Sequence, residues 1–307
     1  MKHLQDKKAL FIPGLPRCAT TSLVNVIGQR NEIGVGIQKE PHYFIPAKDK
    51  EKIYSFDGRK KTPFQKLGFC ETESSYIANY KMLVNEEYFV DASTLYSAYP
   101  ESIKEIAKYF NAPKFVILYR SALSRAYSHY LFSKSRGEEY RDFQSALNEE
   151  VEGVTSEWLL KGYFAGSRLT PLVNEINEIF GKESFLIIDI EKSDLYSKEV
   201  LSAIESFLDL DSIDYDFAIY ENGSTSLSNP LLRWIRKVLK KIRQLNPELI
   251  DNKVTRKLFN FFMSISPKAK KNNSELSSVS YETKKLFKDL DDENRELLQK
   301  YASRVVC

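Results

Sequence analysis

Residues 8–27 read KALFIPGLPRCATTSLVNVI and combine a strand, a polar loop and the start of a helix. The apolar run 9–12 is typical of a buried strand, which Pro13 and Gly14 end. Hydroxyl residues 20–22 then open a helix whose apolar positions continue to Ile27. A strand that passes into a helix in this way leaves unpaired backbone N–H groups at the positive end of the helix dipole. The stretch therefore predicts an anion site, with phosphate as the expected occupant.

Further apolar strands recur along the chain and alternate with helical segments. Strands are expected at 33–37, 88–93, 114–119 and 184–188, and helices at 100–110, 121–135, 143–151, 170–180, 197–208 and 280–305. This alternation predicts an α/β fold of three layers, in which a central, mainly parallel sheet carries a P-loop and is flanked by helices. We expect a single domain over 1–307, with a core of about 8–210, a polar surface loop at 45–70 and a helical, basic C-terminal extension of about 228–307.

Composition places the chain among soluble globular proteins. It has 307 residues, of which 42% are apolar, enough for a packed core. No run approaches the roughly 20 apolar residues of a membrane span, and no apolar leader follows Met1, which predicts a cytoplasmic location. The three cysteines and three histidines are scattered, so neither a disulfide framework nor a metal site is predicted.

Positive charge is concentrated late in the chain. The net charge is +3 overall, whereas residues 228–273 alone carry +10, which indicates an anionic partner. The amphipathic helix expected at 231–245 has three interpretations. We favour a core-packing helix with a solvated cationic face over a docking surface for an anionic or lipid-linked saccharide and over a peripheral contact with an anionic membrane. No nucleic-acid partner is expected.

Two common phosphate-binding loops do not fit the opening stretch. Walker A requires G-x-x-x-x-G-K-[ST], and counting from Gly14 both the second Gly and the Lys are missing. Without that Lys the loop is poorly suited to triphosphate hydrolysis, although its N–H groups could hold a simpler anion. A cysteine-phosphatase loop would need Arg six residues after Cys18, where the chain has Val24.

Three motifs resemble those of a known superfamily, and they occur in the same order. Residues 16–23, PRCATTSL, resemble the 5′-phosphosulfate loop of the sulfotransferases that use 3′-phosphoadenosine 5′-phosphosulfate (PAPS), where the pattern is Pro-Lys/Arg-x-Gly-Thr-Thr-x-Leu. Residues 39–44, KEPHYF, are similar to the Lys-Glu-Pro-His-Phe-Phe stretch of the sulfotransferases that act on carbohydrates. Within that branch the chain resembles bacterial enzymes of the heparan-sulfate type. Residues 119–130, YRSALSRAYSHY, resemble the 3′-phosphate motif, an Arg after a strand and a Ser eight residues later. The resemblance covers the first two thirds of the chain, to about residue 210.

The resemblance implies transfer of a sulfuryl group from PAPS to a hydroxyl, or secondarily an amine, of a carbohydrate acceptor by in-line displacement without a metal. The 5′-phosphosulfate would be held by six consecutive residues, Arg17, Cys18, Ala19, Thr20, Thr21 and Ser22. The 3′-phosphate would be held by Arg120 and Ser128.

The resemblance also implies the catalytic residues. Glu40 would be the general base, with His42 as a second catalytic or acceptor-positioning candidate, and Arg17 would stabilise charge on the leaving oxygen. Two residues depart from the family pattern, since Arg17 replaces the usual Lys and Ala19 replaces a Gly. We expect Ala19 to keep a negative φ, because only glycine adopts a positive φ without cost.

Each motif also has a purely structural interpretation. The hydroxyl turn could be an ordinary helix cap, Glu40 a solvated carboxylate, Arg120 the partner of a carboxylate, and Ser128 a surface hydroxyl. Cys18, beside Arg17 at a helix N-terminus, is expected to have a lowered pKa and to be oxidisable. For the whole chain, the alternatives are an atypical P-loop kinase and a non-catalytic protein that binds a nucleotide bisphosphate or a membrane.

Overall fold

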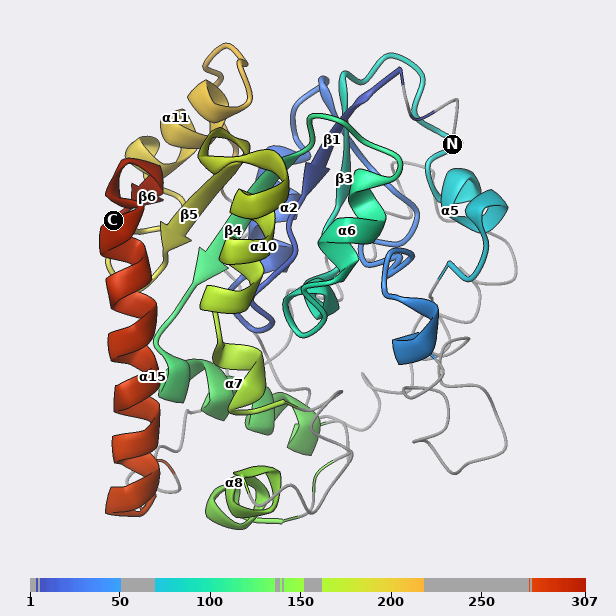
Figure 1. Ribbon diagram of the computed structural model, residues 1–307. Helices are drawn as coiled ribbons and strands as arrows, with labels where there is room; N and C mark the ends of the chain where they lie inside the picture. Colours follow the sequence, from blue (N-terminus) through green and yellow to red (C-terminus); the bar gives the residue numbers. More distant parts are fainter. Residues whose placement is uncertain are drawn as a thin grey trace, which may run out of the picture.

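Six strands form one sheet in which every neighbouring pair is parallel, in the order β2-β3-β1-β4-β5-β6 (Figure 1). The computed structural model describes residues 4, 6–50, 70–135, 139, 141–151, 162–217, 276 and 278–307. The strands are β1 (Lys8–Phe11), β2 (Ile33–Val35), β3 (Tyr88–Asp91), β4 (Lys114–Tyr119), β5 (Phe185–Asp189) and β6 (Val305–Val306). This arrangement confirms the predicted α/β fold.

Helices cover both faces of the sheet. On one face α10 (Thr170–Phe180) contacts α6 (Ser102–Ala107) and α15 (Tyr281–Lys300). On the other face lies α2 (Thr20–Ile27), as expected for right-handed crossovers that leave β1 and β3 in opposite directions. The helix α11 (Lys198–Phe207) is joined to the chain just after α2 by the ion pair of Arg30 with Glu205. Two more helices, α7 (Ala122–Ser135) and α8 (Phe143–Val151), lie beyond the carboxyl ends of β4 and β5, and α5 (Glu73–Asn79) lies between β2 and β3 in sequence (Figure 1).

Aromatic packing at the end of β1 forms the centre of the core. The ring of Phe11 lies 5.5–6.3 Å from four other rings, those of Phe44, Phe89, Phe110 and Phe115. These residues come from four separate segments, so the packing fixes the segments around the point where β1 ends.

In the part of the chain that the structure describes, no helix has both the length and the apolarity to cross a bilayer.

The observed elements differ from the predicted ones in three places. The expected loop at 45–70 contains a helical turn at 47–50, and α5 was not predicted. The expected helix 280–305 ends at Lys300, and Val305 and Val306 pair with β5 instead. The end of the chain is therefore part of the sheet. Residues 51–69 of the expected loop and the basic helix expected at 231–245 lie outside the described residues.

A buried arginine fixes the far end of α2. The Arg30 side chain has no solvent exposure, and its Nη1 donates to Glu205 on α11 at 2.8 Å. Its Nη2 donates to the carbonyl of Asp211 at 2.7 Å and to Glu32 at 3.1 Å. A buried guanidinium with several acceptors ties α2 to α11 and to the chain that follows α11.

We expect Arg30→Met to lower the free energy of unfolding by about 3 kcal/mol, because it leaves the Glu205 carboxylate buried without its cation. Urea denaturation measures this. As a control, Lys108→Met breaks a solvent-exposed pair with Glu105 and should cost less than about 1 kcal/mol. Equal losses in the two variants would contradict the assignment of Arg30 as a buried anchor.

Candidate functional site

The candidate residues come together at the carboxyl edge of the sheet. The phosphate loop, residues 13–19, follows β1. Glu40 lies beyond the end of β2, and Arg120 directly follows β4. In parallel α/β sheets this is the edge at which ligands bind, because the loops that leave the strands converge there.

The first half of the phosphate loop is hydrogen-bonded to its neighbours. The N–H of Leu15 donates to the carbonyl of Leu118 at 2.9 Å, and the N–H of Leu118 donates to that of Gly14 at 3.0 Å. Ser97 N–H donates to Pro13 at 3.0 Å. Gly14 is required at this point, because a Cβ there would lie 2.8 Å from the Cβ of Ser97. The loop is therefore held from β4 on one side and from the 3₁₀ turn Thr94–Ser97 on the other.

The second half of the loop contains two residues with left-handed backbone. Arg17 has φ 69° and Ala19 has φ 60°, so the expectation of a negative φ at Ala19 was wrong. Ala19 is the N-cap of α2, and no side chain caps the helix. The first amides of α2 therefore lack helical partners and are available to an anion.

Arg17 lies against an aromatic ring of α7. Its Cζ is 4.3 Å from the ring centroid of Phe132, a cation–π contact. Burial lowers the pKa of the Arg17 guanidinium, and the nearby charge of Arg120 lowers it further. Among the described residues its buried Nε has no hydrogen-bond partner. Such an atom is suited to an anionic acceptor from outside the chain.

Cys18 points the other way, into the core. It is fully buried, and burial raises the pKa of its thiol to about 12. The expected low-pKa, oxidisable thiol was therefore wrong, because desolvation outweighs the nearby arginines. Only the backbone of Cys18 can contribute to an anion site.

Lys39 is a site residue that the sequence interpretation missed. Its Nζ lies 3.2 Å from Thr20 Oγ1 and 3.0 Å from Thr21 Oγ1, at the first turn of α2. It also lies 2.8 Å from Oε1 of Glu40. The signal was present in the quoted KEPHYF stretch, which begins with this lysine. Lys39 joins the anion site to the candidate base.

The carboxylate of Glu40 interacts with three side chains. Besides Lys39, its Oε2 lies 3.0 Å from Thr94 Oγ1 and 3.4 Å from His42 Nε2. Burial favours the neutral acid, but the hydrogen bond from His42 and the charge of Lys39 outweigh it and hold the pKa of Glu40 well below its usual range. Glu40 is therefore ionised at neutral pH and can accept a proton.

A buried carboxylate supports His42 and its neighbours. Asp91, at the end of β3, accepts from Ser93 N–H at 3.0 Å, Tyr76 Oη at 3.1 Å and Tyr96 Oη at 3.0 Å. The Ser93 hydroxyl in turn accepts from the N–H of His42 at 2.8 Å, where φ is 52°. Burial raises the pKa of Asp91 to about 6. Asp91 was not among the predicted site residues, although it lies at the end of a predicted strand.

Arg120 and Ser128 flank the N-terminal half of α7. Arg120 Nε lies 3.6 Å from Oε1 of Glu191, and that oxygen also accepts from Ser121 Oγ at 2.8 Å. Ser128 is half-buried two turns further along α7. The carboxylate partner that the structural interpretation of Arg120 requires is therefore present.

Comparison with solved structures identifies the fold. A crystal structure of a sulfotransferase from Alicyclobacillus acidocaldarius matches at a TM-score of 0.60 with 22% identity, covering 81% of this chain and 99% of that one. The chain has a sulfotransferase fold. Weaker matches are a sulfotransferase domain from the curacin biosynthetic pathway (TM-score 0.43, 16% identity, 67% and 75% covered) and one from the Synechococcus PCC 7002 olefin synthase (0.41, 14%, 93% and 94%). No protein-family model and no curated protein sequence matches the chain.

In this sulfotransferase fold, Lys39 connects some of the predicted residues, and others lie apart from them. The first turn of α2, Lys39, Glu40 and His42 are connected by the contacts above. Arg120 approaches Arg17 closely enough to shift its pKa, whereas no hydrogen bond between described residues joins Ser128 to the loop. Within the described ranges, no three His, Cys, Asp or Glu side chains gather in a way that suits a metal ion.

We expect Ala19→Gly to raise the free energy of unfolding by about 0.5–1 kcal/mol, because glycine adopts φ 60° without the steric cost that alanine has there. Urea denaturation measures the change. The matched control is Ala203→Gly in α11, where right-handed helix makes glycine destabilising by about 1 kcal/mol. A loss of stability in both variants would show that Ala19 is not strained.

A second prediction concerns Asp91 and pH. Because its folded pKa of about 6 lies above the ordinary 3.8, the folded state binds this proton more tightly, and stability from this group rises as pH falls. Relative to Asp91→Asn, the wild type should gain about 2 kcal/mol between pH 7.5 and 4.5, at about 1.4 kcal/mol for each pKa unit. Urea denaturation at the two pH values measures this difference. A relative loss toward pH 4.5 would show that the hydrogen bonds dominate and that the pKa is lowered.

Proposed function

We propose that the protein is a sulfotransferase that uses PAPS and transfers its sulfuryl group to a hydroxyl of a carbohydrate. One observation carries the proposal: Lys39 lies between the uncapped first turn of α2 and the ionised carboxylate of Glu40. An anion-binding helix start and a proton acceptor are thereby adjacent. The sulfotransferase fold and the three sequence motifs support the same activity.

The donor set fits a molecule with two anionic groups. The free amides of α2, the threonine hydroxyls and the unpartnered Nε of Arg17 suit a 5′-phosphosulfate. Arg120 suits a 3′-phosphate some distance away, if the phosphate replaces Glu191 as its partner. Bound PAPS would supply an activated sulfuryl group, whose S–O bond to the 5′-phosphate is the one that breaks.

The chain's own residues would then handle the proton and the charge. Glu40 accepts the proton of the acceptor hydroxyl while the hydroxyl oxygen bonds to sulfur. Arg17 and the α2 amides stabilise the negative charge that the leaving phosphate oxygen gains. An anion at α2 also competes with Glu40 for Lys39, which would relieve the depression of the Glu40 pKa and make Glu40 a stronger base.

Calorimetry distinguishes this function from a kinase. The wild type should bind adenosine 3′,5′-bisphosphate in the absence of magnesium and more tightly than Mg-ATP, because Arg120 offers a site for the 3′-phosphate. Preference for Mg-ATP would refute the proposal in favour of a P-loop kinase.

A glycan panel with labelled PAPS then tests the acceptor class, and labelling of no saccharide would refute the carbohydrate assignment.

Glu40→Gln should reduce transfer by at least about 100-fold, the ordinary contribution of a general base. Bisphosphate affinity should rise modestly rather than fall, because the substitution removes the carboxylate that competes with the bound anion for Lys39. A control carboxylate variant, Glu105→Gln on α6, should leave both unchanged. Full activity of Glu40→Gln would disprove the assignment of the base.

A further inference from the structure

Arg125 is a fully buried arginine with every N–H group in use. On α7 it has no solvent exposure, and a guanidinium has five N–H donors. Nε donates to Ser167 Oγ at 2.7 Å, and Nη2 donates to the carbonyls of Gly162 and Tyr163, both at 2.7 Å. Nη1 bonds Pro16 O and His129 Nδ1, both at 3.3 Å. One side chain thus connects the phosphate loop, α7 and residues 162–167, which we call the anchor segment.

None of these five acceptors is a carboxylate. Among the described residues, the positive charge of Arg125 therefore lies behind the phosphate loop without a hydrogen-bonded negative charge. Burial lowers the pKa of Arg125 to about 10, so the group remains protonated at neutral pH. A buried cation in this place favours an anion on the outer side of the loop.

The anchor segment is itself held rigidly by side chains from other parts of the chain. Glu150 of α8 accepts from the N–H groups of Phe164 at 3.0 Å and Ala165 at 2.9 Å. Asn294 of α15 donates to the carbonyl of Ser167 at 3.1 Å. The fully buried carboxylate of Glu139 accepts from Tyr163 Oη at 3.0 Å.

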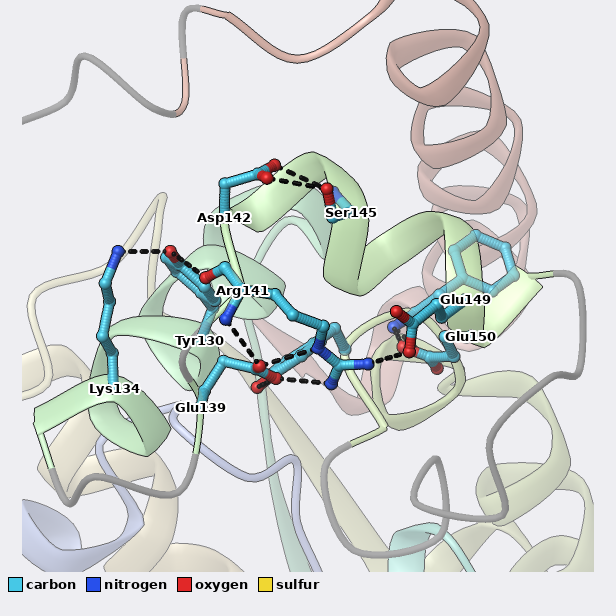
Figure 2. Close-up of polar contacts among 10 residues, drawn as sticks. Tyr130, Lys134, Glu139, Arg141, Asp142, Ser145, Glu149 and Glu150 are labelled. Atoms are coloured by element: carbon cyan, nitrogen blue, oxygen red, sulfur yellow. Dashed lines mark hydrogen bonds and ion pairs between the residues drawn. The ribbon is translucent and has the colours of Figure 1, made fainter.

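A partly buried arginine completes this support. Figure 2 shows Arg141 reaching Glu139 with two hydrogen bonds and continuing to Glu149, close to Glu150. The anchor segment is thus fixed from α8 and α15, and the guanidinium of Arg125 is fixed with it.

Gly166 allows the guanidinium to lie this close to the anchor segment. A Cβ at Gly166 would be 3.1 Å from Nη1 of Arg125 and 3.4 Å from its Cζ. Nη1 is the nitrogen that bonds Pro16. Gly166 does not have a positive φ, so alanine is conformationally allowed there, and the three atoms nearest to its methyl group would all belong to the guanidinium.

We propose that Arg125 is a positioning residue of the phosphate loop, and that by holding the carbonyl of Pro16 it keeps Arg17 and Ala19 in the left-handed conformations that open the loop to an anion. Two strained residues persist only where their surroundings fix them, and Pro16 directly precedes the first of them. The expected effect of Arg125 on binding of the sulfuryl donor rests on the proposed function. Its effect on the backbone conformation of the phosphate loop does not.

Two variants test the proposal with two measurements. Arg125→Lys keeps the charge but loses the fork of donors, and Gly166→Ala keeps Arg125 but displaces Nη1. In both, hydrogen exchange at the amides of Leu15 and Cys18, which are hydrogen-bonded within and beside the loop, should accelerate at least about tenfold in the protein without ligand. The Kd for adenosine 3′,5′-bisphosphate should rise at least about tenfold in parallel.

Ala203→Gly in α11 is the matched control, because it destabilises a helix that shares no hydrogen bond between described residues with the anchor segment, Arg125 or the loop. It should lower Tm as much as Gly166→Ala does, yet leave loop exchange and bisphosphate Kd within about threefold of the wild type. If Gly166→Ala lowers Tm with exchange and Kd unchanged, Arg125 is merely a core residue and the proposal is overturned.

The two measurements also separate this inference from the proposed function. If the wild type binds no bisphosphate, the function fails, while loop exchange still decides the role of Arg125. Should Arg125→Lys fail to fold, Gly166→Ala gives the answer alone, since it removes no polar group.

Discussion

The backbone of the phosphate loop has to hold two non-glycine residues in left-handed conformations, at a cost of about 1–2 kcal/mol each. Contacts with neighbouring parts of the structure offset this conformational cost. Two hydrogen bonds with β4 fix the start of the loop, and the thiol of Cys18 is buried beneath it. Phe132 covers Arg17, and Arg125 bonds Pro16. Because Ala19 is the N-cap and has no side-chain oxygen, α2 begins without a side-chain cap, and its first amides have no helical partners.

Electrostatics at this edge of the sheet follow from the same geometry. Arg17, Lys39 and Arg120 bring three positive charges to it, and Glu40 and Glu191 answer two of them in the free protein. An arriving dianion would compete for those cations. The three cations and two carboxylates sum to +1 without ligand, so the site attracts an anion, and a bound anion would pair with cations that the carboxylates hold in the free protein.

The sequence predicted most of the sheet, because parallel strands buried on both faces are continuous apolar runs that need no alternation to be recognised. It also predicted the α2 turn, which follows a strand end, whereas Glu40 was expected from the resemblance of residues 39–44 to a family motif and its role as a base stays a prediction. It could not predict the φ of Ala19 or the burial of Cys18, which depend on how the loop packs against β4 and α7. Arg125 was missed for another reason: its five acceptors are four backbone or hydroxyl oxygens and a ring nitrogen, none of which leaves a charge pattern in the sequence. Strand β6 was hidden because two residues are too short a run to recognise.

The pairing of β5 with β6 has a consequence for folding. Ile187 pairs with Val305, 118 residues further along the chain, and the next longest span in the sheet is that of Leu10 with Lys114, at 104 residues. Closing a loop of this length loses conformational entropy before any strand contact compensates for the loss. We therefore expect the pairing of β5 with β6 to form slowly. The edge of β5 therefore stays open in any intermediate that has already formed the β2-β3-β1-β4-β5 sheet. During that interval the exposed strand edge is the part of the molecule most open to pairing with another chain.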